Sequence, residues 1–245
     1  MIEYKTVRSL KRKTLSLQVK HGQVTVRAPY FISSSFINDF VLDKTPWLKN
    51  KIAEQVTINQ DKCNFEDGSH VLHLGIERQL NVILAKRSAV YLNDENNSVV
   101  VAVGSQVIAN ITMKSGDDLV IQKRLLQEQV KKQLEGFFKA QMTSYLDQYL
   151  GDFVELTKLE PKSFQVRQYK SRWGSCNSKK ELQFNYLLLM APPWVINYVI
   201  IHELCHLKHL NHSSDFWHLV SSFEPDFRLA KAWFKTHQSK LHWRV

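Results

Sequence analysis

The stretch His202-Glu203-Leu204-Cys205-His206, followed by His212, carries the most specific information in this chain of 245 residues. Residues four apart lie on one face of a helix, so His202 and His206 can present two imidazole nitrogens to one metal ion. Glu203 points about 100° away from His202 around the helix axis, beside such an ion. A carboxylate there can take a proton from a metal-bound water and later donate it to a leaving group.

The residues before this motif supply the context that a buried metal helix requires. Pro192-Pro193 precede an apolar run from 194 to 201, which predicts a helix opened by proline. A core helix that merely contained histidines would bury polar rings at a cost in free energy, which argues against a chance match. His212 lies beyond the expected helix end, where a turning chain can bring a third imidazole back. Three protein ligands and one open position are typical of catalytic zinc.

Charge and cysteine usage limit the class of protein. The net charge of +10 favours an anionic partner, such as nucleic acid, a phosphate-bearing substrate or an acidic membrane surface. The alternative is a solvated basic surface that only maintains solubility. Three widely spaced cysteines form no disulfide framework and suit a reducing compartment. Because no signal peptide or membrane span is evident either, we expect a cytoplasmic protein.

The N-terminal half predicts a β-rich region with one helix. Alternating apolar residues around His21-Gly22 predict a β-hairpin, and the nearby cluster Lys11-Arg12-Lys13 suits either phosphate contacts or a charged strand edge. The segment from Ser33 to about Gln55 has the pattern of an amphipathic helix, which we expect to be kinked at Pro46. Four strands are expected within 69–111, at 71–75, 80–84, 89–92 and 99–103.

The C-terminal half predicts a long helix and a second group of strands. Apolar residues recur at helical spacing from Asp117 to about Leu150, and a domain transition is expected between 104 and 118. Strands are expected at 164–169 and 181–189, and the second could hold an extended peptide by β-addition. Ser213 and its neighbours could cap a further helix. We therefore divide the chain into a β-rich region, 1–112, and a catalytic domain, 113–245.

Three separated blocks carry a family resemblance. They are Arg172-Trp173-Gly174-Ser175-Cys176, then Asn185, then 202–212 with Phe216-Trp217. In order and spacing these blocks resemble the YgjP-like metallopeptidase family, which is related in motif to SprT-like and other zincins. The match is strong over the last third of the chain and looser over the N-terminal part. It implies an α+β fold with a zincin-like core, in which a small sheet packs on the long helix and the motif helix. It further implies Zn²⁺ on His202, His206 and His212, Glu203 as general base, and a site near Arg172 and Trp173.

The third ligand has an alternative. His209 stands where metzincins place a glycine that turns the chain, and histidine adopts unusual backbone conformations less readily than glycine. Glu224 is therefore the reserve ligand, as in glutamate-type zincins. Asp215 is expected to orient a ligand imidazole. His212 remains the first choice because imidazole suits zinc.

Three further residues are candidates for substrate binding. Arg172 could stabilise an oxyanion or a substrate carboxylate or phosphate, or it could pair with a carboxylate across the sheet. Trp173 is expected to pack against the metal helix. Asn185 could donate a hydrogen bond into the cleft, as could Tyr198.

The sequence thus predicts a metal-dependent hydrolase, and specifically a zinc metallopeptidase that acts on a peptide or protein. The alternative on the same site is hydrolysis of a nucleotide phosphoanhydride. Magnesium with oxygen ligands would favour phosphate chemistry, whereas zinc with imidazoles favours amide hydrolysis. A third hypothesis is a nucleic-acid-associated module that binds through the basic N-terminal hairpin.

Overall fold

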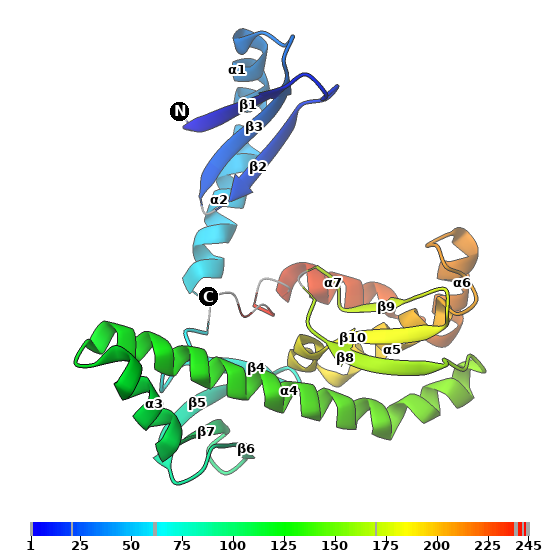
Figure 1. The fold of residues 1–245 in the computed structure, drawn as a ribbon. Helices are drawn as coiled ribbons and strands as arrows, with labels where there is room; N and C mark the ends of the chain where they lie inside the picture. Colours follow the sequence, from blue (N-terminus) through cyan, green and yellow to red (C-terminus); the bar gives the residue numbers. More distant parts are fainter. Residues whose placement is uncertain are drawn as a thin grey trace. The chain divides into compact units, whose positions relative to one another are not determined.

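The chain forms two compact units, Met1–Lys62 (unit 1) and Cys63–Val245 (unit 2), each with its own apolar core. The computed structural model describes residues 2–20, 22–60, 63–169, 171–237, 240–241 and 243, without the side chains of 54–60. His21 of the predicted hairpin turn lies outside this range. The described elements are three small mixed sheets, seven helices and one 3-10 helix, which confirms the predicted α+β class (Figure 1).

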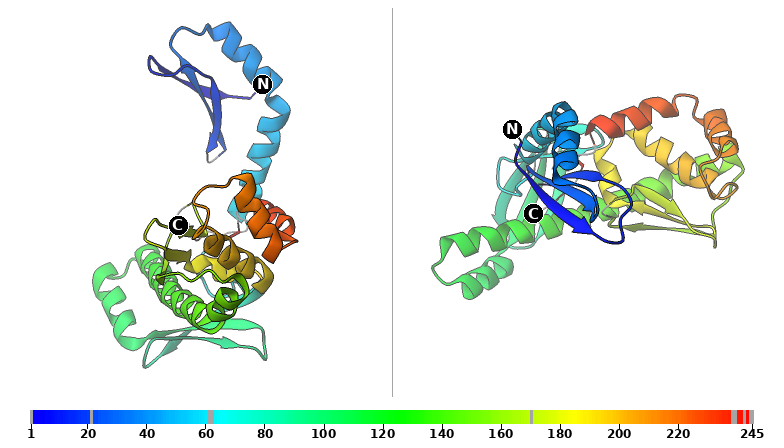
Figure 2. Two further views of the ribbon diagram at one scale, coloured as in Figure 1. Left: turned by 90° about the vertical axis from the view of Figure 1, so that its right-hand side faces the viewer. Right: turned by 90° about the horizontal axis from the view of Figure 1, so that it is seen from above.

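Unit 1 contains a three-stranded sheet. Its strands are β1 (Tyr4–Ser9), β2 (Ser16–Lys20) and β3 (Gln23–Pro29), in the order β1-β3-β2. Strands β2 and β3 are antiparallel, as the predicted hairpin requires, while β1 joins β3 in parallel. Two helices cover one face of the sheet, α1 (Ser34–Asp43) and α2 (Thr45–Gln60) (Figure 2).

The predicted single helix of unit 1 is divided in two. Ser33 caps α1, and its side chain accepts a hydrogen bond from the backbone of Phe36. Lys44 ends α1 with φ −90° and ψ 5°. Pro46 lies in the first turn of α2, where its missing N–H breaks no helical hydrogen bond. The prediction of one kinked helix was therefore wrong, because the proline begins a new helix.

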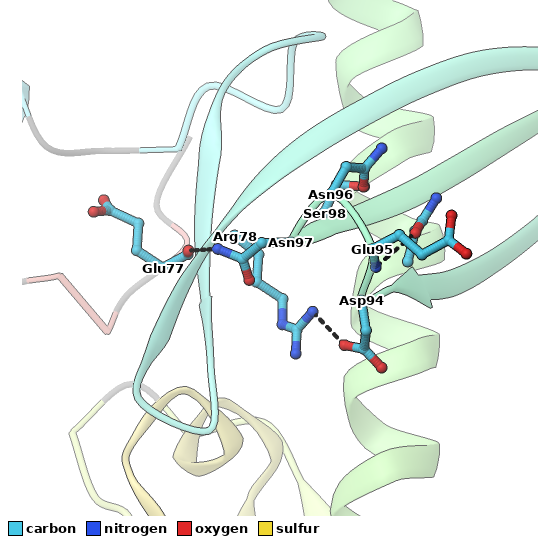
Figure 3. A network of polar contacts seen from close by, with 8 residues as sticks. Glu77, Arg78, Asp94, Glu95, Asn96, Asn97 and Ser98 are labelled. Atoms are coloured by element: carbon cyan, nitrogen blue, oxygen red, sulfur yellow. Dashed lines mark hydrogen bonds and ion pairs between the residues drawn. The ribbon is translucent and has the colours of Figure 1, made fainter.

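Unit 2 begins with the four strands expected within 69–111. They are β4 (His70–His73), β5 (Ile76–Ala85), β6 (Ala89–Asn93) and β7 (Ser98–Gly104), in the order β4-β5-β7-β6. Figure 3 shows the hydrogen bonds between the turn after β6 and strand β5. The Arg78 guanidinium donates to the Asp94 carboxylate at 2.8 Å, and the Asn97 amide donates to the Glu77 carbonyl at 3.0 Å.

The long helix of unit 2, α4 (Leu119–Thr157), contributes a continuous stripe of buried side chains to the core of this unit. Asp118 caps it by accepting hydrogen bonds from Val120 and Ile121. Its buried stripe repeats every four residues and consists of Val130, Leu134, Phe138, Met142, Leu146 and Leu150. The segment expected to be a domain transition is instead partly a helix, α3 (Ser105–Ser115).

The C-terminal part of unit 2 holds the motif helix. A sheet of order β8-β10-β9 consists of β8 (Ser163–Arg167), β9 (Gly174–Cys176) and β10 (Glu181–Asn185). The predicted strand 181–189 ends at Asn185, whose side chain caps a 3-10 helix, η1 (Tyr186–Met190). The helices that follow are α5 (Pro193–Cys205), α6 (Ser214–Phe223) and α7 (Phe227–His237), and α5 contacts α4, α6, α7 and β9 (Figure 1).

The division into units differs from the predicted boundary between 112 and 113. Strands β4, β5 and β7 supply Val71, Leu80 and Val101 to the same apolar cluster as Leu134 of α4. The four-stranded sheet therefore belongs with α4, and the contact boundary lies between Lys62 and Cys63. The three cysteines are free. None of the described helices is both long and apolar enough to cross a membrane.

Candidate metal centre and active site

Helix α5 brings the motif into the core. Pro193 occupies its first turn, where proline is favoured, and apolar residues such as Val195 and Val199 are buried along it. His202 lies in its last turn and His206 is its C-cap residue, whose backbone N–H donates to the His202 carbonyl at 3.3 Å. The two imidazoles therefore project from one face, as the four-residue spacing predicted.

Three imidazoles converge at this end of α5. One ring nitrogen from each of His202, His206 and His212 lies within 4.8 Å of the others. The Nε2 atoms of His202 and His212 are 3.0 Å apart. Two ligand nitrogens of a tetrahedral zinc site stand about 3.3 Å apart, given Zn–N bonds of about 2.0–2.1 Å. The donor set and its spacing thus fit a zinc ion, and these residues could hold a metal.

The turn from His206 to His212 closes without the glycine that metzincins use. His209 is not among the described residues with positive φ, so its side chain causes no backbone strain. The backbone N–H groups of Lys208 and His209 both donate to the Cys205 carbonyl at 3.1 Å. The conformational objection to His212 as third ligand therefore does not apply.

The same turn orients His206. Its Nδ1 lies 2.9 Å from the His209 carbonyl. A carbonyl can only accept, so Nδ1 carries the proton and Nε2 keeps its lone pair for a metal. Asp215 was expected to orient a ligand imidazole, but for His206 a backbone carbonyl does this. On the other side, Nδ1 of His202 faces the Tyr198 hydroxyl at 3.5 Å.

Burial favours the neutral form of two of the three histidines, His202 and His206. It lowers the pKa of His202 to about 3, with smaller contributions from His206, His212 and Lys231. Burial also lowers the pKa of His206, although the hydrogen bond to His209 opposes this. Because neutral imidazole is the form that binds metals, the site favours the state required for binding.

Aromatic rings of α6 form the floor of the site. Phe216 is fully buried, and its ring centroid lies 4.9, 4.4 and 4.9 Å from those of His202, His206 and His212. Trp217 stacks on His212 at 5.5 Å. These contacts restrict the rotation of the three imidazoles, so the rings are held ready before any ligand binds.

Glu203 is a buried carboxylate beside the imidazoles. Only 5% of the residue is exposed, and its Oε2 has no hydrogen-bond partner among the described residues. Burial raises the pKa of Glu203 to about 8, while the positive charge of Arg172 lowers it. A buried carboxylate without a partner is costly, so its retention points to a chemical role.

Gly174 on β9 makes room for this carboxylate. A Cβ atom at Gly174 would lie 2.5 Å from Oε1, 2.6 Å from Cγ and 2.8 Å from Cδ of Glu203. The glycine is therefore needed for close packing and not for a special backbone angle. The motif containing Gly174 was noted in the sequence, but no spacing rule connects position 174 to position 203.

The Gly174→Ala variant is expected to lower kcat about 10- to 100-fold, because the new methyl group must displace the buried Glu203 side chain. The metal content should stay unchanged, since the variant touches no imidazole. Steady-state kinetics and elemental analysis measure both quantities. Ser175→Ala on the same strand is the matched control and should retain full activity. An unchanged kcat in Gly174→Ala would contradict the close packing.

The three candidate substrate residues lie in different surroundings. The exposed Arg172 stacks on the Tyr169 ring at 5.3 Å, and no ion pair of Arg172 with a described carboxylate occurs. Trp173 stacks on Phe234 of α7 at 5.3 Å and packs against the apolar cluster that contains Val199 of the metal helix. Asn185 is 1% exposed; its amide N–H groups donate to the carbonyls of Tyr169 and Arg172 at 3.0 and 3.2 Å. Asn185 therefore holds the loop that carries Arg172.

A cavity of about 450 Å³ adjoins the motif. His202 and Glu203 line it from α5, and Trp173 and Gly174 line it from the region of β9. Helix α7, which the sequence analysis did not identify, contributes Lys231, Phe234 and Lys235. Asn185 does not line this cavity. Glu224, the reserve ligand, is a half-buried residue after α6 and is not part of the histidine cluster.

Helix α5 with His202, Glu203 and its C-cap residue His206, together with His212 from the following turn, has the arrangement of the HExxH metal sites found in catalytic zinc proteins. A model of the YgjP-like metallopeptidase domain matches residues 13–237. The chain therefore belongs to the YgjP-like metallopeptidase family, as the motifs predicted.

A solved structure is also similar to part of the chain. The crystal structure of the metallopeptidase zymogen of Pyrococcus abyssi abylysin is 20% identical and has a TM-score of 0.35. The alignment covers 38% of this chain and 95% of that chain. A search of curated proteins gave no match. The family assignment thus depends on the domain match and the motifs, and a metallopeptidase family suggests a metal-dependent hydrolase.

Proposed function

We propose that the protein is a zinc-dependent peptidase in which His202, His206 and His212 hold the metal and Glu203 is the catalytic base. The observation that carries the proposal is the buried Glu203 carboxylate, with one oxygen unpartnered, beside three converging imidazoles. A zinc ion in such a set supplies a Lewis acid that polarises a carbonyl and lowers the pKa of a bound water.

The protein's own contribution is to position and tune Glu203. Its unpartnered oxygen accepts the proton of the attacking water and later donates it to the leaving amine. The positive charge of Arg172 favours the ionised carboxylate, which is the form that can accept a proton. Burial raises the pKa of Glu203 and so makes the carboxylate a stronger base than it would be in water.

Strand β9 is the element best suited to hold an extended peptide. Among the described strands it pairs with β10 alone, at the edge of the sheet, and it contacts α5. A substrate strand can add to such an edge through backbone hydrogen bonds. From the sequence, this role was predicted for the strand at 181–189. That assignment was wrong, because β10 lies in the centre of the sheet and pairs with β8 and β9.

The cavity's charge supports a preference for substrates with a carboxylate near the scissile bond. Lys231 and Lys235 line it, and Glu203 is its one acidic lining residue in the described chain. The Lys231 ammonium lies 4.0 Å from the Trp217 ring centroid, which restricts its position. The double variant Lys231→Gln/Lys235→Gln is expected to lower kcat/KM about tenfold for peptides with an acidic residue.

The same double variant should cleave a matched neutral peptide at the wild-type rate, and peptide pairs that differ at one residue measure this. Lys208→Gln is the control, because Lys208 is exposed and lies outside the cavity lining. An equal loss on both peptides would contradict a role for the two lysines in selectivity.

Metal removal tests the proposed function itself. Chelation is expected to reduce the hydrolysis of a peptide library below detection, and zinc is expected to restore it. The basic cavity would also suit a phosphate group, so nucleoside triphosphates with Mg²⁺ belong in the same assay. Imidazole ligands favour zinc over magnesium, which prefers oxygen. Chelator-resistant peptide hydrolysis would contradict the proposal, as would Mg²⁺-dependent nucleotide hydrolysis without peptide cleavage.

A further inference from the structure

The N-terminal segment has a charge distribution that the proposed peptidase chemistry does not use. Residues 4–38 contain seven Lys and Arg residues and no Asp or Glu. The basic residues are Lys5, Arg8, Lys11, Arg12, Lys13, Lys20 and Arg27. In the described part of unit 1 none of them forms an ion pair with a carboxylate. A segment with this many cations and no acidic residue is suited to bind a polyanion.

The sheet of unit 1 presents part of this charge on its open face. Val24, Val26 and Ala28 of β3 are buried with Ile37 and Val41 of α1, so the helices occupy the opposite face (Figure 2).

The strand register identifies the residues of the open face. Thr25 of β3 pairs with Lys5 on one side and with Gln18 on the other, so these three side chains form one row across the sheet. The next rows on the same face contain the pair Val7↔Arg27 and the pair Lys20↔Gln23. All of these residues except the half-buried Thr25 are exposed. Apart from Val7, the face consists of cations and neutral hydrogen-bonding groups.

One end of the same sheet carries exposed aromatic rings beside further cations. Strands β1 and β3 are parallel and end at the pair Ser9↔Pro29. The chain then continues into Leu10-Lys11-Arg12-Lys13 after β1 and into Tyr30-Phe31 after β3. Tyr30 is 65% exposed and Phe31 is 77% exposed. Neighbouring exposed apolar groups rimmed by polar residues are typical of an interaction site.

Arg8 holds the backbone that carries these rings. Its guanidinium donates to the carbonyls of Tyr30, at 3.0 Å, and Ile32, and to the Ser34 hydroxyl at 3.1 Å. The Tyr30 N–H donates to the Ser9 carbonyl at 3.2 Å. The backbone is therefore fixed while the rings remain open to solvent, which lowers the entropy cost of binding through them.

We propose that this surface of unit 1, the open sheet face together with 10–13 and Tyr30-Phe31, binds single-stranded nucleic acid. Lys5, Lys20, Arg27 and the cations of 10–13 contact phosphates, and the two rings stack on bases. A duplex buries the faces of its bases, so it cannot use the rings. An anionic membrane would need a continuous apolar face to insert, but the sheet face is polar.

Fluorescence anisotropy of the full-length protein with a labelled oligothymidylate of about 15 nucleotides tests this proposal. We expect wild-type binding that weakens as salt rises from about 50 to 200 mM. The double variant Lys11→Gln/Lys13→Gln should bind about tenfold more weakly, and the negative slope of log affinity against log salt should become shallower by about 1.4. The double variant Tyr30→Ala/Phe31→Ala should lose at least about fivefold in affinity with an unchanged slope.

Two controls separate this site from general basicity. Lys132→Gln/Lys139→Gln removes two exposed charges from α4 and should bind like the wild type. A duplex of the same length should bind more weakly, without sensitivity to the two rings. The proposal is overturned if the oligothymidylate does not bind at low salt, or if both lysine pairs have equal effects. Ring-independent binding would also overturn it, as would binding only to phosphatidylcholine vesicles containing phosphatidylserine.

Discussion

Replacing Glu203 with glutamine is expected to lower kcat for peptide hydrolysis about a thousandfold while the zinc content stays unchanged. The amide has nearly the same shape as the carboxylate but cannot accept a proton. The side chain is buried and its Oε2 has no described partner, so the substitution breaks no described hydrogen bond to that oxygen. The loss should appear in kcat because proton transfer belongs to the chemical step.

Stability measurements separate a chemical effect from misfolding. Burial raises the pKa of Glu203 to about 8 in the folded protein, so near pH 7 folding disfavours the ionised form that the unfolded chain prefers. The destabilisation grows as pH rises above the unfolded value of 4.5 and levels off above about 8. Metal-free Glu203→Gln should therefore be at least as stable as the metal-free wild type at pH 7.

Glu224→Gln is the matched control for Glu203→Gln. Glu224 is a half-buried glutamate at the end of α6, outside the histidine cluster, and its loss should leave kcat unchanged. Kinetics, elemental analysis and thermal unfolding of both variants measure the comparison. A folded, zinc-loaded Glu203→Gln protein with wild-type kcat would show that Glu203 is not the catalytic base.

The His212→Ala variant is expected to lose most of its metal when the protein is prepared without added zinc. The wild type should contain about one zinc per chain. Losing a residue that orients a ligand already weakens metal binding about 10- to 100-fold, so losing a ligand itself should cost more. His212 also reaches the site from a separate turn, and no other described histidine, cysteine or carboxylate joins the cluster to replace it.

His218→Ala is the matched control for His212→Ala. His218 is an exposed histidine on α6, outside the metal cluster, and this variant should retain its zinc. Full retention of zinc by His212→Ala would move the third ligand to Glu224 or elsewhere. A wild-type protein that takes up no transition metal, even when zinc is offered, would refute the zinc peptidase proposal.

The sequence predicted the elements whose signals are local. The buried stripe of α4 repeats every four residues, and the caps Ser33, Asp118 and Ser213 each lie next to the helix they begin. The four strands of 70–104 are short apolar segments, and polar turn residues such as Asp94 to Asn97 separate two of them. The spacing of His202 and His206 depends only on helix geometry. These features need no knowledge of distant contacts.

Some elements were missed because their stabilising contacts are distant in sequence. Strand β1 is a short, mostly polar segment that pairs in parallel with β3, about twenty residues away. Helix α7 was missed although Phe227, Ala230 and Phe234 recur at helical spacing and pack against the core. Asn185 was expected to face the cleft, but its amide donates to the carbonyls of Tyr169 and Arg172. An asparagine in a strand does not reveal its partner.

The metal-binding motif, the α+β class and the family could thus be read from residue type and short-range spacing, because backbone geometry alone places residues four apart on one helical face. The immediate surroundings of Glu203 could not be predicted from residue type and short-range spacing. Gly174 approaches it from β9, and Lys231 and Lys235 line its cavity from α7. These neighbours come together only when the sheet and helices pack on α5, and such long-range contacts leave no periodic trace in the sequence.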